Sequence, residues 1–270
     1  MTKHDPIDEY FSGKKLYGND FSEEEIKNWF IDEENGYYDL GAGNRDSYEY
    51  GYQALNCEYG FRHLPDGRFN RLLGIGSAYG DELKPVVNNF NQIVILEPSD
   101  GFQVKSLSNT PVTYVKPQPD GKMPFSDNHF DLITCFGVLH HIPNVSMVLN
   151  EIYRCLNSGG YALIREPTGS MGDWRKPRQG LTRHERGIPL KLFREIINDA
   201  GFNIVSERQC MFSLTSRLRY FLQKPVYNSR LAIFIDRMLC AIPIWADVYH
   251  PGNIFQKLRP ASVFYVLKKP

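Results

Sequence analysis

The stretch that decides the fold reads Phe69-Asn70-Arg71-Leu72-Leu73-Gly74-Ile75-Gly76-Ser77-Ala78-Tyr79-Gly80. An apolar run ends here in a glycine-rich turn, and a polar segment compatible with a helix follows it. Glycine lets the backbone turn sharply and approach a ligand closely, and the first N–H groups of a helix suit a carboxylate or phosphate. A second apolar run, 93–96, ends in Glu97, whose carboxylate can accept hydrogen bonds from both hydroxyls of a ribose. The pattern predicts that the chain binds a nucleoside-containing cofactor.

A second glycine-containing segment, Asp39-Leu40-Gly41-Ala42-Gly43-Asn44, also looks like the end of a strand. No apolar strand precedes it, and no second strand follows at the right distance. We therefore expect a loop at 39–44 and assign the nucleotide-binding turn to 69–80, which has both neighbours that a βαβ unit requires.

Apolar, strand-like runs alternate with helical segments from residue 69 to residue 167, as in a parallel sheet with crossover helices. We expect strands at 69–75, 92–96, 112–115, 130–136 and 161–165. A helix at 145–156 is expected to stop at Asn157-Ser158-Gly159-Gly160. Beyond it, the sequence predicts a helix over 189–200, a strand at 203–209, two helical pieces between 213 and 242 and a last strand at 262–267.

Residues 1–65 form an acidic, aromatic-rich extension. Residues 1–60 carry 5 Lys and Arg against 14 Asp and Glu, a net charge of −9, although the whole chain is neutral. Ser22 and Glu25 form a capping box that opens a helix through Trp29 and Phe30. The aromatic residues of 37–61 form either a lid that excludes water from the cofactor or a cover over one face of the sheet.

The composition is that of an ordinary soluble globular protein. The chain has 270 residues, of which 42% are hydrophobic and 23% charged, and this length fits one elaborated domain. A net charge of zero gives no overall argument for nucleic acid. The N-terminus has no apolar signal region, and the most apolar stretch, 231–246, is interrupted by charges and Pro243, so we expect no membrane span.

Cysteine usage points to a reducing compartment. The cysteines are odd in number, widely spaced and without a CxxC motif: Cys57, Cys135, Cys155, Cys210 and Cys240. This pattern predicts reduced thiols, no disulfides, no zinc site and a cytoplasmic location.

Two nucleoside cofactors use a glycine turn of this kind. The dinucleotide fingerprint G-x-G-x-x-G needs a glycine where the chain has Tyr79, a poor replacement where helix and strand pack tightly. The G-x-G-x-G turn of S-adenosylmethionine enzymes needs a glycine where the chain has Ala78, a much smaller change. The turn therefore favours the methyl donor over a dinucleotide.

Three further sequence motifs follow one another along the chain: Pro124-Phe125-Ser126-Asp127-Asn128-His129-Phe130-Asp131-Leu132-Ile133, Leu139-His140-His141-Ile142-Pro143 and Leu156-Asn157-Ser158-Gly159-Gly160-Tyr161. With the turn, they resemble the class I S-adenosylmethionine-dependent methyltransferases, and most of all the small-molecule branch that includes ubiquinone and menaquinone methyltransferases. The resemblance covers 69–167 well, 188–202 and the last strand loosely, and the rest hardly at all.

The resemblance implies an α/β, Rossmann-like fold. Its sheet has seven strands, mostly parallel, with an antiparallel last strand and helices on both faces. We expect the methyltransferase domain at 66–270, with the extension 1–65 in front of it and a helical insert before the last strand. Substrate-side insertions are expected at 167–188 and 213–258.

The resemblance also implies S-adenosyl-L-methionine as the cofactor, no metal, and a set of binding residues. Gly74, Gly76 and Ala78 would cradle the methionine part of the cofactor, Glu97 would hold the ribose, Pro98 and Ser99 would line the adenine, Asp120 with Gly121 would lie near its amino group, and Cys135 and Phe136 would offer main-chain groups. Leu72 replaces an acidic residue that is usual in the family, so the contact to the cofactor's amino group is either missing or supplied elsewhere.

Methyl transfer is a displacement on a cationic sulfonium, for which a protein supplies alignment, a dry site and, for oxygen or nitrogen acceptors, removal of a proton. His140 and His141 are the candidate catalytic residues; the alternative is that they cap a turn and pack. Glu166 either faces the substrate or makes a structural hydrogen bond.

Two segments bear on partners. The loop 174–186 carries five basic residues, which either recognise an anionic acceptor or are solvated. The basic amphipathic stretch 213–246 can lie against a membrane, another subunit, a lipid-linked substrate or the chain's own core.

Together these features predict a cytoplasmic methyltransferase that acts at oxygen or nitrogen of a small-molecule or glycan-precursor acceptor. One alternative is an inactive scaffold or regulatory subunit that binds S-adenosylmethionine or S-adenosylhomocysteine, since Leu72 is not acidic and no base is obvious. A less favoured alternative is a nicotinamide-dependent oxidoreductase.

Overall fold

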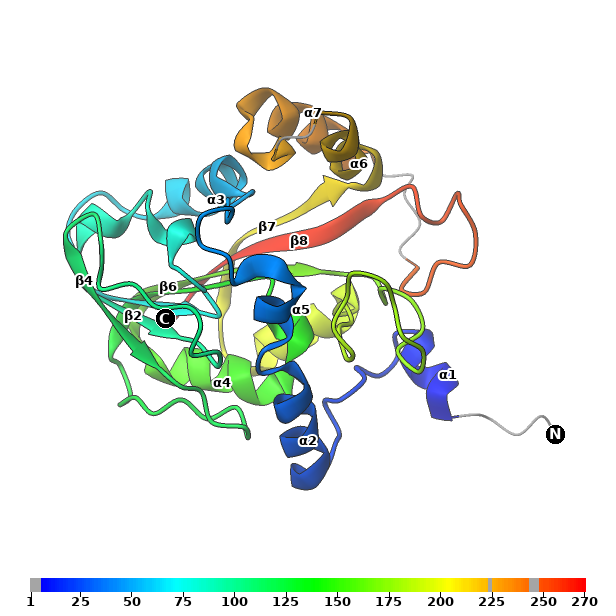
Figure 1. Cartoon of the computed structure of the whole chain (residues 1–270), viewed down its shortest axis with the longest axis horizontal. Helices are drawn as coiled ribbons and strands as arrows, with labels where there is room; N and C mark the ends of the chain where they lie inside the picture. The colour runs from blue at the N-terminus through cyan, green and yellow to red at the C-terminus, as the bar shows by residue number, and fades with distance from the viewer. Residues whose placement is uncertain (1–5, 223–224, 243–247) are drawn as a thin grey trace.

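The computed structural model describes residues 6–222, 225–242 and 248–270 and contains one mixed sheet (Figure 1). Within these residues the sheet has eight strands in the order β3-β4-β2-β1-β5-β6-β8-β7. The strands are β1 (Phe69–Ile75), β2 (Phe90–Leu96), β3 (Ser106–Leu107), β4 (Thr110–Val115), β5 (Phe130–Phe136), β6 (Leu156–Pro167), β7 (Asn203–Phe212) and β8 (Pro260–Lys268). The predicted α/β fold is confirmed.

Strand direction follows the expected pattern. Strands β4, β2, β1, β5 and β6 pair in parallel, whereas β8 is antiparallel to both β6 and β7. The two-residue β3 adds an antiparallel edge beside β4 that the sequence did not predict. The seven longer strands match the seven that were expected.

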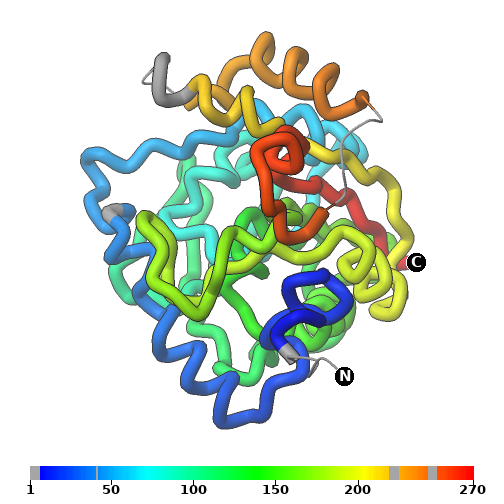
Figure 2. Tube along the Cα trace, turned by 90° about the vertical axis from the view of Figure 1, so that its right-hand side faces the viewer, coloured from blue at the N-terminus to red at the C-terminus, as the bar shows by residue number. Residues whose placement is uncertain are grey.

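Helices cover both faces of the sheet. They are α1 (Pro6–Phe11), α2 (Glu23–Glu33), α3 (Gln53–Tyr59), α4 (Val145–Cys155), α5 (Leu190–Asp199), α6 (Ser213–Leu222) and α7 (Arg230–Cys240). Helices α4 and α5 lie on one face and α3, α6 and α7 on the other (Figure 1). In the side view, the blue N-terminal part of the tube, which contains α1 and α2, passes beside the yellow-green loop that follows β6 (Figure 2).

The core has two layers because successive side chains of a strand point to opposite faces. Leu73 and Ile75 of β1 pack with α4 and α5, while Leu72 packs with α3 on the other side. Strands buried on both faces read as continuous apolar runs, which explains why β1, β2 and β5 were predicted within two residues of their ends. Helix α4 buries Val148 and Ile152 along one stripe of a helical period.

The prediction of a helix after the glycine turn is wrong. The chain forms only a 3₁₀ turn at Asp81–Leu83 and a second at Val87–Asn89 before β2 begins. Pro85 has no N–H to donate, so it cannot supply the main-chain hydrogen bond that would extend the turn Asp81–Leu83 into an α-helix. The turn therefore offers no N-terminus of an α-helix to a ligand.

The prediction that α4 ends at the glycine pair Gly159-Gly160 is also wrong. The helix ends at Cys155, and β6 begins at once with Leu156, which pairs with Phe130. The N–H of Gly159 donates to the carbonyl of Lys269 at 2.9 Å, so the glycine pair lies inside the sheet. Pairing with strands on both sides outweighs the local tendency of glycine to end a helix.

Most of the other predicted elements are confirmed. Ser22 and Glu25 form the capping box of α2, and Gly201, with φ of 93°, follows α5 and Ala200. The segment 39–44 is not a strand and turn; it contains a short π-helical turn, Tyr38–Ala42. All five cysteines are free thiols.

Helix α7 leaves much of its apolar face uncovered. Ile233 and Asp236 are buried against β7, while Leu231, Phe234 and Met238 are 69%, 54% and 56% exposed. Among the described residues no helix combines the length and the apolar character that crossing a membrane requires. The predictions that concern residues 1–5, Lys224 and 243–247, and the side chain of Arg219, fall outside the described part of the chain.

Candidate active site

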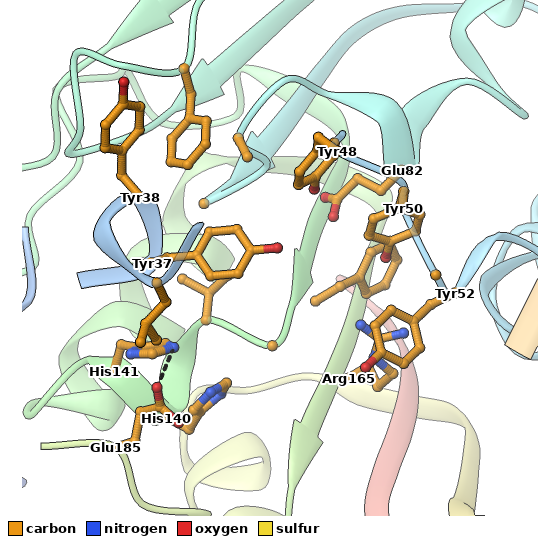
Figure 3. A pocket seen from close by; sticks show the side chains of 18 of the residues that line it. Tyr37, Tyr38, Tyr48, Tyr50, Tyr52, Glu82, His140, His141, Arg165 and Glu185 are labelled. Atoms are coloured by element: carbon orange, nitrogen blue, oxygen red, sulfur yellow. Dashed lines mark ion pairs between the residues drawn. The ribbon is translucent and has the colours of Figure 1, made fainter. Parts of the chain in front are cut away.

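A cavity of about 770 Å³ opens at the carboxyl ends of β1, β2, β5 and β6. This volume is within the range of roughly 300–1,000 Å³ that is usual for ligand pockets, and the position is where open α/β sheets bind ligands. Tyrosines of the N-terminal extension point into it from one side, and loop residues that follow β5 and β6 close the other (Figure 3). The extension thus contributes directly to the site.

The aromatic segment 37–61 is divided between the cavity and the core. Its first tyrosines line the cavity: Tyr37, Tyr38, Tyr48, Tyr50 and Tyr52. Tyr59 and Phe61 instead pack into the core on one face of the sheet.

Gly76 allows two loops to meet at the floor of the cavity. Its φ is 59°, its N–H donates to the carbonyl of Leu96 at 2.8 Å, and a Cβ at this position would lie 2.6 Å from Val138 Cγ2. Any other residue would both strain the backbone and collide with the loop after β5. The glycine turn therefore sets the distance between β1 and β5 at the site.

Glu97 ends β2 and presents a buried carboxylate to the cavity. Its oxygens accept the N–H of Ala78 at 3.0 Å and the N–H of Ser99 at 3.3 Å. Burial raises the pKa of Glu97 to about 7, although these two hydrogen bonds lower it. No basic side chain in the described residues forms an ion pair with it, so its remaining lone pairs can accept the hydroxyls of a ribose.

Two charged residues of the cavity escaped the sequence analysis. Glu82 accepts a hydrogen bond from the Ser77 hydroxyl at 2.7 Å, and burial raises its pKa to about 7. The buried guanidinium of Arg165 donates to Asn56 Oδ1 at 3.2 Å, and its carbon lies 4.0 Å from the centre of the Tyr52 ring. An arginine inside the apolar run of β6 is a signal that could have identified the second of them.

Glu166 is structural. Its fully buried carboxylate accepts the N–H groups of Val138, Leu139 and His140 at 2.8, 2.8 and 3.3 Å. It also lies 2.8 Å from Nδ1 of His140. The carboxylate thereby holds the turn Leu139–His141 in place, and it does not line the cavity.

His140 and His141 both line the cavity, with their ring centres 4.2 Å apart. Burial and the neighbouring His141 lower the pKa of His140. Burial also acts to lower the pKa of His141, but the hydrogen bond to Glu33 and the charge of Glu185 outweigh it and raise that pKa. The two rings therefore differ in charge preference although they are neighbours in sequence.

The basic loop 174–186 offers no cluster for an anion. Its arginines have partners inside the protein: Asp173 for Arg175, main-chain carbonyls for Arg178 and Arg186, and Asp32 for Arg183. The contacts of Arg183 and Arg186 hold the loop against α2 and against the turn after β5.

The structure brings together most of the predicted site residues. Those that line the cavity are Gly76, Ala78, Glu97, Pro98, Phe136, His140 and His141. Gly74, Ser99 and the fully buried Cys135 lie behind this lining. Asp120 and Gly121 lie in the turn between β4 and β5, where Asp120 pairs with Lys122, outside the lining.

A family model described as "Methyltransferase domain" matches residues 48–207, more than half of the chain. The chain belongs to this family of methyltransferases, whose cofactor is S-adenosylmethionine. The family resemblance predicted from the sequence is confirmed, and the nicotinamide-dependent alternative is wrong.

Curated relatives agree over a shorter stretch. The ubiquinone/menaquinone biosynthesis C-methyltransferase UbiE of Stenotrophomonas maltophilia (strain R551-3) is 40% identical over 78 residues, which are 29% of this chain and 30% of that protein. UbiE of Xanthomonas campestris pv. campestris is 38% identical over 55 residues, 20% of this chain and 22% of the relative. The match thus spans about a third or less of these relatives.

Solved structures share the fold. An S-adenosylmethionine-dependent methyltransferase from Mesorhizobium loti is 14% identical with a TM-score of 0.52, over 77% of this chain and 95% of that one. The cyclase SpnF is 22% identical with a TM-score of 0.52, over 81% of this chain and 80% of that one. At these identities the likeness concerns the fold alone.

Proposed function

We propose that this chain transfers a methyl group from S-adenosylmethionine to a small acceptor bound in the same cavity. The observation that carries the proposal is the continuity of this cavity. One space is lined by Gly76 and Glu97 at the ends of β1 and β2 and by His140 and His141 after β5. A single space of this kind allows cofactor and acceptor to be held side by side.

The residues at the ends of β1 and β2 fit the cofactor, which supplies the methyl group on a cationic sulfonium. Glu97 accepts the ribose hydroxyls. Gly76 and Ala78 leave room for the methionine part of the cofactor. Pro98 and Phe102 give apolar surface for the adenine. Gly74, Ser99 and Cys135 support this lining from behind.

Glu82 and Arg165 complement the two opposite charges of the methionine end. Both line the cavity, and both act on the buried hydroxyl of Tyr50, Glu82 raising its pKa and Arg165 lowering it. Glu82 then supplies the acidic contact to the ammonium group that Leu72 does not provide. Arg165 has no carboxylate within ion-pair distance among the described residues and can hold the cofactor's carboxylate.

The aromatic walls favour an acceptor with a flat apolar face, either a planar ring or a sugar. Tyr37, Tyr48, Tyr52 and Phe136 supply such surfaces around the space beside His140. An oxygen or nitrogen acceptor fits two imidazoles at this position. Carbon is the alternative acceptor atom, because the curated relatives are C-methyltransferases. The acceptor need not be anionic, since the arginines of 174–186 have partners.

Helix α7 gives the proposal a second component. Its exposed Leu231, Phe234 and Met238 are flanked by Arg230 and Arg237, as in helices that lie on anionic lipid surfaces. We propose that this face makes a peripheral membrane contact. Among the described residues of 213–246, Ile233 and Asp236 are buried by the rest of the chain, whereas Leu231, Phe234 and Met238 are exposed.

The experiment that tests the function has two steps. Calorimetry with S-adenosylhomocysteine and with NAD should show binding of the first alone, because Tyr79 stands where the dinucleotide turn needs a glycine. Transfer of labelled methyl from S-adenosylmethionine is then followed across phenolic, quinol, amine and sugar acceptors. Binding without transfer to any class would favour the inactive scaffold instead.

A further inference from the structure

Three side chains that commonly bind metals meet beside the cavity. His140, His141 and Glu185 each offer one ligand atom, and these atoms lie within 4.8 Å of one another (Figure 3). The histidines belong to the turn Leu139–His141 and the glutamate to the loop between β6 and α5. Their side chains are 11%, 21% and 7% exposed, so the cluster is sheltered but accessible from the cavity.

The outer partners of the two imidazoles leave the same atom free in each ring. Nδ1 of His140 lies 2.8 Å from Glu166 Oε2, and Nδ1 of His141 lies 2.9 Å from Glu33 Oε2. Imidazoles that bind metals almost always donate their other ring N–H to a carboxylate or carbonyl in this way. In a neutral ring with its proton on Nδ1, Nε2 carries the lone pair, and Nε2 of His141 lies 3.9 Å from Glu185 Oε1.

Glu185 is also held in position. Its Oε1 accepts the N–H of Thr182 at 2.9 Å and the hydroxyl of the same residue at 3.1 Å. All three prospective ligands are thus oriented by a second layer of contacts, as they are in metal centres built on rigid supports.

The charge around the cluster calls for a cation. Three carboxylates, Glu33, Glu166 and Glu185, surround two imidazoles in a buried setting. The charges of Arg178 and Arg186 act on these carboxylates, but no salt bridge among the described residues joins either arginine to them. The guanidinium of Arg186 donates instead to main-chain carbonyls, those of Tyr17, Leu139, Ile142 and Pro143. Buried charges of this kind are paired or coordinate a metal.

We propose that His140, His141 and Glu185 bind one divalent transition-metal ion, although the sequence led us to expect no metal. Two imidazoles and one carboxylate suit Zn²⁺, Fe²⁺ or Mn²⁺, whereas Mg²⁺ prefers a shell of oxygens. With three protein ligands the ion keeps open positions toward the cavity. In a role that rests on the proposed function, it binds an acceptor oxygen and lowers the pKa of that oxygen, so the histidines act as ligands instead of bases.

The test measures metal binding to the full-length protein after treatment with a chelator. Titration with Zn²⁺ should show one tight site per chain, and Co²⁺ should give visible absorption bands without a thiolate charge-transfer band. His141→Gln and Glu185→Gln should each weaken this site by more than the ~10–100-fold typical of losing an outer partner, which is the loss expected for Glu33→Gln. His63→Gln, a half-buried histidine far from the cluster in sequence, serves as the control and should bind as the wild type does.

Other results would overturn the proposal. It fails if no stoichiometric site appears, if binding survives in both ligand variants, or if Mg²⁺ competes with Zn²⁺ at similar concentrations. Circular dichroism of each variant confirms that it is folded. Because binding is read without cofactor or acceptor, absence of methyl transfer by the metal-loaded protein counts against the proposed function and leaves the metal site standing.

Discussion

At the scale of single residues, Glu97 links cofactor binding to pH. Burial raises the pKa of its carboxyl to about 7 in the cofactor-free protein, so much of it is protonated below pH 7. Only the carboxylate accepts both hydroxyls of a ribose. The affinity for S-adenosylhomocysteine should therefore fall as pH decreases through 7, approaching about tenfold per pH unit well below the pKa.

Calorimetry between pH 5.5 and pH 8.5 checks this dependence. Glu97→Gln should bind at least about tenfold more weakly at pH 8 and lose the part of the dependence that Glu97 causes. Glu82→Gln is the matched control, because the pKa of Glu82 is also about 7 and its own contribution must be separated. A flat profile for the wild type would contradict the role of Glu97.

Gly76 gives a second prediction at this scale. Gly76→Ala places a methyl group 2.6 Å from Val138 Cγ2 at a φ of 59°, so both strain and collision act. We expect the left-handed backbone to cost about 1–2 kcal/mol and the collision a further ~1–3 kcal/mol of the free energy of unfolding. Urea denaturation measures the sum.

Gly180→Ala separates the two effects. Gly180 has a φ of 73° and open space where a Cβ would be, so only the backbone cost of about 1–2 kcal/mol should appear. Adding Val138→Ala to Gly76→Ala should return the stability to a similar value. Equal losses in the two single variants would show that the contact with Val138 is unimportant.

At the scale of elements, Arg186 joins the N-terminal extension to the turn after β5. Its buried guanidinium donates to carbonyls at 2.7 to 3.1 Å on both, and burial lowers its pKa to about 10. Lysine has a compact charge with three donors and cannot reproduce this fork. Arg186→Lys should lower the free energy of unfolding by about 1.5–3 kcal/mol, measured by denaturant titration.

Arg183→Lys is the control for that experiment. Arg183 lies in the same loop and pairs with Asp32, but its side chain is largely exposed. A surface pair of this kind contributes about 0–1 kcal/mol, so the substitution should leave stability nearly unchanged. A similar loss in both variants would mean that Arg186 has no special role.

At the scale of the whole molecule, the exposed face of α7 predicts where the protein meets a surface. Phe234→Ser with Met238→Ser should reduce sedimentation with anionic lipid vesicles several-fold, because buried apolar area drives such binding. Stability should hardly change, since both side chains are exposed. Ile31→Ser alters an exposed residue of α2 and should leave vesicle binding intact.

Features that depend on neighbouring residues could be predicted from the sequence, whereas features that depend on distant contacts could not. Strands such as β1 and β5 were predictable because burial on both faces makes each a continuous apolar run. The glycine turn and Glu97 were predictable because they end such runs. The helix expected after the turn failed because Pro85 and a short connection favour 3₁₀ turns.

The parts of the site that could not be predicted depend on contacts between distant segments. Glu33, His141 and Glu185 lie in three separate regions of the chain and meet only because α2 packs beside the loop after β6. Nothing local marks Glu82 as a member of the cavity. A single sequence carries the identities of these residues but not their convergence.

The place of β8 in the sheet also affects how the chain is made. This strand separates β6 from β7, yet it is translated after both of them and after α6 and α7. On the ribosome, β6 therefore leaves the exit tunnel with one edge unpaired and β7 with both edges unpaired, and such edges attract other nascent chains. Translation of 260–268 is the step that joins the two parts of the sheet and protects them.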